Sequence, residues 1–364
     1  MENISKKSID KIFENVKNSS CLPGMLVASN SKQDPDYFYH WIRDSAIVMK
    51  SIVIYYEKYN CDKAFKIIIG YINNEIEIQN MKSCVDVGEP KYNTNRTPYT
   101  EPWGRPQNDG PALRGLTMIR IYKLFSNEYP SLCKLIINCI TKDLNYVMKN
   151  HNNHCFDLWE EIDGYHLYTR LVQCKFLKEC LNIPLNVDYN KILNIKNRLM
   201  DLISHHNIRY TSFGHNGICC RDYDGSLLLG ICHIDYDSEI LEINNDNFKF
   251  YLQDIIKYFK NEYKINRNKT FTLLGRYKDD KYYLGNPWII TTVAMFQIKK
   301  YFENNNIKNN LEFLKNQNTD DFINYILKKN DFNLAEQIDK NNDNCIGAYN
   351  LNWNYSELFM LSLL

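Results

Sequence analysis

The sequence predicts an all-α protein in which paired helices can form an inner ring wrapped by an outer ring. Apolar residues recur at helical spacing along most of the 364 residues. Only 14 Gly and 10 Pro interrupt the chain, which is typical of long helices joined by modest loops. The helix candidates number roughly twelve and follow one another in pairs, which suits a toroid. Periodicity by itself does not establish that the ring closes.

The first candidate helix, 8–16, places Ile9, Ile12 and Phe13 on one face. The next, 41–59, is apolar around nearly its whole circumference, as expected of an inner helix. The remaining candidates, in chain order, are 112–125, 131–148, 165–180, 187–203, 248–263, 287–302 (with Pro287 at a plausible first helical position), 319–328 and 356–364. Strand signals are weak and are limited to 208–212 and 282–284.

No linker rich in Ser, Gly or Pro divides the chain, so we expect residues 1–364 to form a single domain. Lys plus Arg is 44 and Asp plus Glu is 43, a net charge of +1, which excludes a general nucleic-acid binder or a polybasic membrane binder. No segment reaches the ~18 apolar residues of a membrane span, and the N-terminus lacks the form of a signal peptide. The 12 cysteines are scattered without a CxxC pair. We therefore expect free thiols, an intracellular, cytoplasmic location and a monomer.

The five tryptophans lie in polar segments beside carboxylates, Arg or Asn, each at the mouth of a candidate helix: Trp41, Trp103, Trp159, Trp288 and Trp353. Taken singly, a Trp is usually a core residue and a pair such as Glu160 and Glu161 is usually a solvated helix face. In a ring of helices, however, these segments can converge at one end. Indole faces stack on sugar rings, Arg with Asp grips hydroxyls, and paired carboxyls hydrolyse glycosidic bonds. The combination indicates a polyhydroxylated ligand without saying which one.

Five segments carry a family resemblance, and they read PDYFYHWIRDS at 35–45, WGRPQNDGPALR at 103–114, DLWEE at 157–161, GRY with NPW at 275–288, and EQID with a late W at 336–353. Together they resemble the glucoamylase family, glycoside hydrolase family 15, from about Gly24 to Tyr355. The resemblance implies an (α/α)6 barrel, which agrees with the helix pairing.

The resemblance also implies the activity: release of β-D-glucose from the non-reducing ends of α-1,4-linked chains such as glycogen, starch and maltooligosaccharides, with inversion at the anomeric carbon. It implies that Glu160 is the general acid and Glu336 the general base. Glu160 must carry a proton for the leaving oxygen, and Glu336 must stay ionised to accept a proton from the attacking water. An inverting pair needs a gap of roughly 6.5–9.5 Å between its carboxyls.

By the same resemblance, the residues expected to bind the substrate are Tyr37, Trp41, Arg43, Asp44, Trp103, Asp157, Trp159, Glu161, Arg276, Trp288 and Trp353. Those expected to hold sugar hydroxyls are Arg43, Asp44 and Arg276. Tyr37 is expected beneath the ring being cleaved, and Asp157 and Glu161 are expected to support the acid and the adjoining sugar. The mechanism calls for no metal and no organic cofactor.

Two departures from the family pattern affect the expected site. Asn108 stands where the family often has Arg, which would alter a pocket contact, and Gly347 stands where some fungal members have a small hydroxylated residue near the base. The chain stops soon after the last motif, so we expect no separate starch-binding domain.

Two alternatives stay open. The first is a related α-glucosidase that acts on another linkage, such as trehalose or α-1,6-glucan, because loop shape sets linkage preference. The second is a non-catalytic domain that senses glycans. That second hypothesis predicts loss of the acid or the base, and both Glu160 and Glu336 are present.

Overall fold

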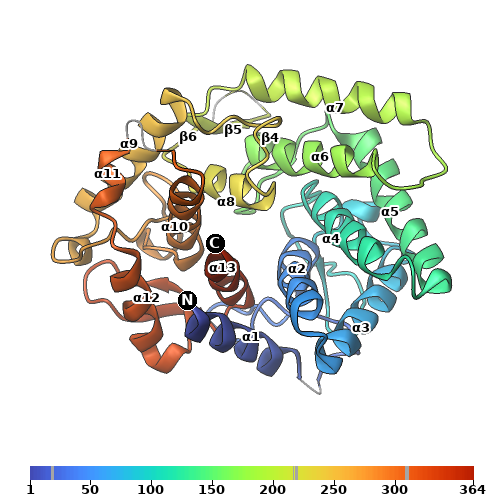
Figure 1. Ribbon diagram of the computed structural model, residues 1–364, viewed down its shortest axis with the longest axis horizontal. Coiled ribbons are helices and arrows are strands. Elements are labelled where there is room, and N and C mark those ends of the chain that lie inside the picture. The colour runs from blue at the N-terminus through green and yellow to red at the C-terminus, as the bar shows by residue number, and fades with distance from the viewer. Residues whose placement is uncertain (18–19, 216, 218–219, 308–310) are drawn as a thin grey trace.

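The computed structural model describes residues 1–17, 20–215, 217, 220–307 and 311–364. Its long helices form two concentric rings (Figure 1). The inner ring consists of α2 (Ile42–Tyr59), α4 (Gly110–Phe125), α6 (Leu167–Cys180), α8 (Ser226–His233), α10 (Ile289–Asn304) and α13 (Asn352–Leu363). Each of these contacts the next, and α13 contacts α2, so the ring closes.

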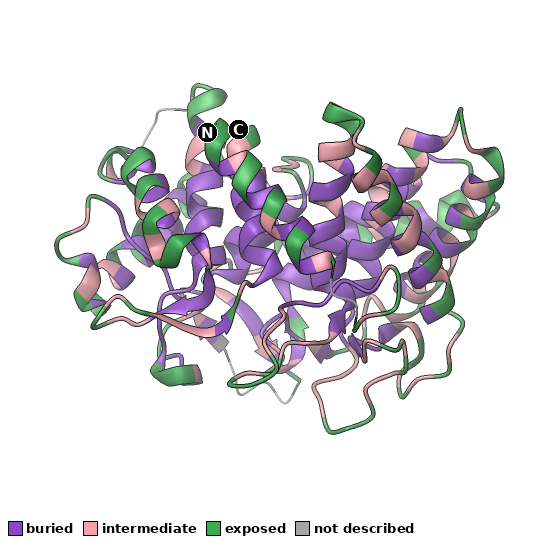
Figure 2. Cartoon of the chain, turned by 90° about the horizontal axis from the view of Figure 1, so that it is seen from below, coloured by how far each residue is buried: buried purple, intermediate pink, exposed green. Residues whose placement is uncertain are grey.

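The outer ring wraps the inner one (Figure 1), and exposed residues lie mainly at the periphery of the molecule, whose middle is buried (Figure 2). It consists of α1 (Glu2–Val16), α3 (Asp62–Ile78), α5 (Pro130–Asn150), α7 (Tyr189–Ser204), α9 (Asp246–Glu262) and α12 (Thr319–Lys328), with the short α11 (Glu312–Lys315) nearby. The sequence explains the two layers: α8 is buried along its whole length, whereas α7 buries only a stripe of Ile192, Leu199 and Ile203. The predicted all-α, (α/α)6 barrel is confirmed.

Most helix ends lie within two residues of their predicted positions, and the residues of α12 match the prediction, but α1 and α13 begin earlier than predicted, at Glu2 and Asn352. Helices α3, α8 and the short α11 were not among the predicted ranges, although Ala64, Ile68 and Ile72 give α3 a buried stripe and α8 is buried throughout. Pro287 does not begin α10, because its carbonyl accepts a hydrogen bond from the Ile338 N–H (3.0 Å) in extended backbone before the helix.

The structure contains more strands than predicted. They are β1 (His40–Trp41), β2 (Lys91–Tyr92), β3 (Cys155–Phe156), β4 (Asp163–His166), β5 (Tyr210–Gly214), β6 (Cys220–Asp222), β7 (Ala335–Ile338) and β8 (Cys345–Tyr349). Strands β3 to β6 form an antiparallel sheet in chain order, and β1–β2 and β7–β8 form separate pairs. These strands are too short to show an alternating pattern, so tertiary pairing defines them.

The expectation of extended backbone at 282–284 is wrong. Those residues form a 3-10 turn, Tyr282–Leu284, in which Tyr283 and Leu284 have positive φ. The other 3-10 turns in the described ranges are Asp86–Gly88, Lys264–Asn266 and Lys329–Phe332.

The inner helices begin at one end of the barrel, and the motif segments precede or open them. Trp41 precedes α2, Asp109 caps α4, Trp288 precedes α10, and Trp353 is the second residue of α13. Helix N-termini carry partial positive charge, so this end favours carboxylates. In the described part of the chain, no helix is both long enough and apolar enough to cross a membrane.

Candidate active site

A cavity of about 530 Å³ lies where these segments meet. Twelve of the thirteen predicted site residues line it: Tyr37, Trp41, Arg43, Asp44, Trp103, Trp159, Glu160, Glu161, Arg276, Trp288, Glu336 and Trp353. Residues from distant parts of the chain therefore share one cavity, because the ring brings the starts of its helices together. The thirteenth residue, Asp157, is buried beneath the cavity wall.

Contacts to its Oε1 atom hold the Glu160 side chain in place. That atom accepts hydrogen bonds from the Trp41 indole N–H and from the Gln107 amide, both at 2.8 Å, and Arg43 Nη2 lies 3.6 Å away. Oε2 has no hydrogen-bond partner within the described ranges. Glu160 also has a φ of +65°, a conformation that costs free energy for a non-glycine residue and often marks functional sites. This arrangement leaves one carboxyl oxygen free to meet a ligand.

Glu336 is fully buried on the hairpin β7–β8, at a register shift that lies between Ala335 and Gln337. Its Oε1 accepts a hydrogen bond from the Tyr37 hydroxyl (2.5 Å) and its Oε2 accepts one from the Gln337 amide (2.8 Å). Burial raises the pKa of Glu336 to about 7, although both hydrogen bonds act to lower it. Tyr37, expected beneath the sugar, thus also contacts the predicted base.

Arg43 and Asp44 open helix α2 and are buried in the cavity wall. Arg43 Nη2 lies 3.2 Å from Asp44 Oδ2, and Arg43 Nη1 donates to Gln107 Oε1 (2.8 Å). Burial raises the pKa of Asp44 to about 6, against the opposing charge of Arg43. The Arg43 Nε–H has no hydrogen-bond partner in the described part of the protein, a rare condition for a buried donor.

Aromatic rings form the other walls. Trp41 packs edge-on against Trp103 (6.0 Å between ring centroids), and Trp159 packs against Trp288 (5.6 Å). The indole N–H groups of Trp103 and Trp288 are buried without a partner among the described residues. Flat apolar faces beside unpaired donors suit a ligand that combines C–H faces with hydroxyls.

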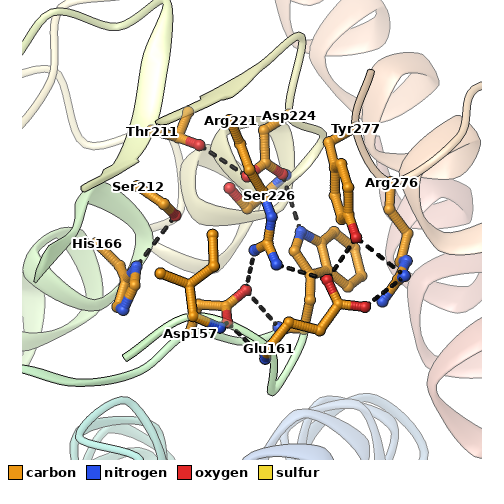
Figure 3. Close-up of polar contacts among 12 residues, drawn as sticks. Asp157, Glu161, His166, Thr211, Ser212, Arg221, Asp224, Ser226, Arg276 and Tyr277 are labelled. Carbon is orange, nitrogen blue, oxygen red and sulfur yellow. Dashed lines mark hydrogen bonds and ion pairs between the residues drawn. The ribbon is translucent and has the colours of Figure 1, made fainter. Parts of the chain in front are cut away.

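A network of charges holds the loop that carries Glu160 (Figure 3). Arg276 Nη2 contacts Glu161 Oε1 (2.7 Å) and Asp280 Oδ1 (2.6 Å). Asp157 does not line the cavity. Its Oδ1 accepts hydrogen bonds from the backbone N–H groups of Glu161 (2.8 Å) and Ile162 (2.7 Å). Asp157 is therefore placed to act on a sugar only indirectly, through the shape of this loop.

Comparison with known proteins identifies the family. The profile described as "Glycosyl hydrolases family 15" matches residues 10–363. The chain belongs to glycoside hydrolase family 15. Its relatives include glucoamylase S1 of Saccharomyces cerevisiae, 31% identical over 352 residues that cover 79% of this chain and 44% of the relative. The intracellular sporulation-specific glucoamylase of the same yeast is 31% identical over 350 residues, covering 79% of this chain and 61% of the relative.

The family 15 chain thus spans about half the length of these curated relatives. Among solved structures, the glucoamylase of Saccharomycopsis fibuligera superposes with a TM-score of 0.86 at 23% identity, covering 100% of this chain and 94% of that one. The Hormoconis resinae glucoamylase superposes with a TM-score of 0.87 at 23% identity, covering 99% of this chain and 72% of that one. These likenesses show the barrel fold.

The two departures from the family 15 pattern lie in different places. Asn108 is buried, does not line the cavity, and accepts a hydrogen bond from the Tyr146 hydroxyl (2.8 Å), so the expected altered pocket contact is not direct. Gly347 lies beside the predicted base: its φ is +78°, and a Cβ there would lie 2.7 Å from Glu336 Oε2. A side chain at this position requires Glu336 or the hairpin to shift.

Sequence reasoning missed several residues of this family 15 site. Gln107 hydrogen-bonds both Arg43 and Glu160. It lies in the WGRPQ segment of the family motif, so the sequence could have indicated it. No motif in the sequence indicated that Lys91 belongs to the site. It pairs with Trp41 in the β1–β2 register, is 2% exposed, and its Nζ lies 3.6–4.6 Å from the centroids of four rings: Tyr39, Trp41, Tyr99 and Trp103.

Burial lowers the pKa of Lys91 to about 8, although the charge of Glu160 raises it. No group of three or more His, Cys, Asp or Glu within the described ranges has the arrangement of a metal site.

The raised pKa of Glu336 predicts a pH profile for a reaction in which Glu336 is the base. A base accepts a proton only when ionised, so kcat/KM should fall about tenfold per pH unit below about 7. Because the Tyr37 hydrogen bond lowers that pKa, Tyr37→Phe should move the acidic limb to higher pH. The measurement is kcat/KM for maltose from pH 4 to 9, and a flat profile down to pH 5 would contradict it.

Proposed function

We propose that this chain is a glucoamylase-like hydrolase that releases β-D-glucose from the non-reducing ends of α-1,4-glucans: glycogen, starch and maltooligosaccharides. The observation that carries the proposal is the placement of Glu160 and Glu336 in one cavity with separate partners. Glu160 keeps a free oxygen, and Glu336 is a buried carboxyl held by two donors. Because burial raises the pKa of Glu336 to about 7, Glu336 serves as the base where it is ionised, near and above neutral pH.

In the proposed mechanism, Glu160 donates a proton from Oε2 to the glycosidic oxygen as that bond breaks. Glu336 takes a proton from a water that attacks the anomeric carbon from the opposite face, which gives inversion. Positive charge develops on the sugar ring in the transition state, and the carboxylates of Asp44 and Glu336 favour it. Arg43, which lines the cavity, and Arg276, whose Nη1 has no partner in the described part of the chain, bind hydroxyls. The chemistry requires no metal or organic cofactor.

The anomer formed first tests the mechanism. Incubation of the protein with maltotriose should yield glucose that is initially β, seen by proton NMR before mutarotation equilibrates the anomers. The reason is geometric, because a single displacement by water inverts the α linkage. Glucose that is initially α would exclude the inverting mechanism.

The substrate class rests on the family and on relatives named as glucoamylases. Rates on maltose, isomaltose, trehalose and glycogen separate the α-1,4 proposal from the trehalose and α-1,6 alternatives. Absence of hydrolysis with all four, while maltotriose still binds, would favour a glycan-sensing domain instead.

We further propose a monomeric, single-domain, intracellular protein. The location is supported by the name of the intracellular yeast relative and by the ten cysteines whose side chains the structure describes, which are free thiols. Cell fractionation and sedimentation test location and oligomeric state.

A further inference from the structure

Behind the cavity wall lies an arginine that no motif indicated. Arg221 belongs to β6, is 5% exposed and does not line the cavity. Its Nη1 contacts Asp157 Oδ2 and its Nη2 donates to Glu161 Oε2 at 2.6 Å (Figure 3). Asp157 and Glu161 are the two ends of the turn that contains Glu160. A single guanidinium therefore ties both ends of this turn.

The turn needs such a restraint. Glu160 has left-handed backbone (φ +65°), which persists only where the surroundings impose it. Asp157 provides the internal brace, since its carboxylate accepts N–H groups from Trp159 (3.1 Å), Glu161 (2.8 Å) and Ile162 (2.7 Å). Burial alone would raise the pKa of Asp157, but the charge of Arg221, together with His166 and the hydrogen bond from the Ile162 N–H, lowers it to about 2. Arg221 thus keeps the Asp157 carboxylate ionised and in place.

The second end of the turn is held from two sides. Arg276 binds Glu161 Oε1 at 2.7 Å, and Arg221 and the Tyr277 hydroxyl both donate to Oε2. The Arg221 guanidinium also packs over the Tyr277 ring, 4.2 Å from its centroid. The planar guanidinium group contacts two carboxylates and a ring face at the same time, which a lysine ammonium cannot do.

We propose that Arg221 is a positioning residue for the acid: by tying Asp157 to Glu161, it directs the Glu160 side chain into the cavity. This inference rests on the proposed function, in which Glu160 donates the proton. Arg221 itself does not touch the substrate. Its loss should therefore weaken proton donation in the transition state more than it weakens sugar binding.

The test compares two substrates that differ in their need for an acid. Maltose requires protonation of a sugar leaving group, whereas α-D-glucosyl fluoride loses fluoride with little help. For Arg221→Met we expect kcat on maltose to fall by about 100-fold, with KM and the rate on α-D-glucosyl fluoride changing by less than about threefold. Arg221→Lys should show the same split between substrates, with a smaller loss.

Controls separate positioning from stability. Arg209→Met removes an exposed arginine that precedes the same β5–β6 hairpin and pairs with Asp222 at 3.3 Å, and it should leave both rates unchanged. Thermal melts check folding, and if Arg221→Met does not fold, Arg221→Lys decides. Equal losses on both substrates, or no loss in a folded variant, overturn the inference. A wild-type protein that hydrolyses neither substrate would instead overturn the proposed function.

Discussion

Glu160→Gln is expected to lower kcat on maltose by roughly 10³–10⁴-fold, because the amide has no acidic proton for the leaving oxygen. The amide oxygen can still accept the hydrogen bonds that Trp41 and Gln107 give to Oε1. The cavity shape is therefore retained, and maltotriose should bind within about threefold of the wild-type affinity. Rates are measured as glucose release. Binding is measured by tryptophan fluorescence, since all five tryptophans line the cavity.

The matched control for this variant is Glu312→Gln, which changes an exposed glutamate that pairs with Lys315 on the surface helix α11. It should leave kcat unchanged. On α-D-glucosyl fluoride, Glu160→Gln should retain most of its rate. A Glu160→Gln enzyme that hydrolyses maltose near the wild-type rate would place the acid elsewhere.

Glu336→Ala is expected to reduce hydrolysis by a similar factor of roughly 10²–10⁴, since no group then takes the proton from water. Azide needs no deprotonation and is small enough for the space left by the side chain. It should restore cleavage of α-D-glucosyl fluoride and give β-D-glucosyl azide, because it attacks from the side where the base lay. NMR of the product identifies the anomer.

Azide should not rescue Glu160→Gln on maltose, because that variant lacks the acid rather than the base. Rescue of the Glu160 variant with an α-azide product would indicate a retaining mechanism. Failure of azide to rescue Glu336→Ala in a folded protein would remove Glu336 from the role of base.

Most of the helices were predictable because their signal is local, whereas α3 and α8 were missed. The repeat in 319–328 gave the limits of α12, and the apolar circumference of 41–59 placed α2 in the inner ring. The sheet β3–β6 was not predictable, since its strands are short; β4, for example, comprises only Asp163–His166. Its consequence is functional, because β6 carries Arg221.

The two glutamates and the five tryptophans were found in the sequence through family motifs, which are contiguous runs of residues. Lys91 and Arg221 stand alone in their segments. Their importance comes from neighbours distant in sequence: Arg221 from Asp157 and Lys91 from Trp103.

The amino-acid order by itself determined most of the helical segments, the apolar circumference of 41–59, and which residue types are available for glycoside chemistry, because these properties depend on neighbours within a few positions. Tertiary structure alone decided that the ring closes, that Glu336 is fully buried with a pKa near 7, and that Arg221 ties the turn around Glu160. Burial and charge pairing depend on groups brought together by folding, and sequence spacing does not encode their distances.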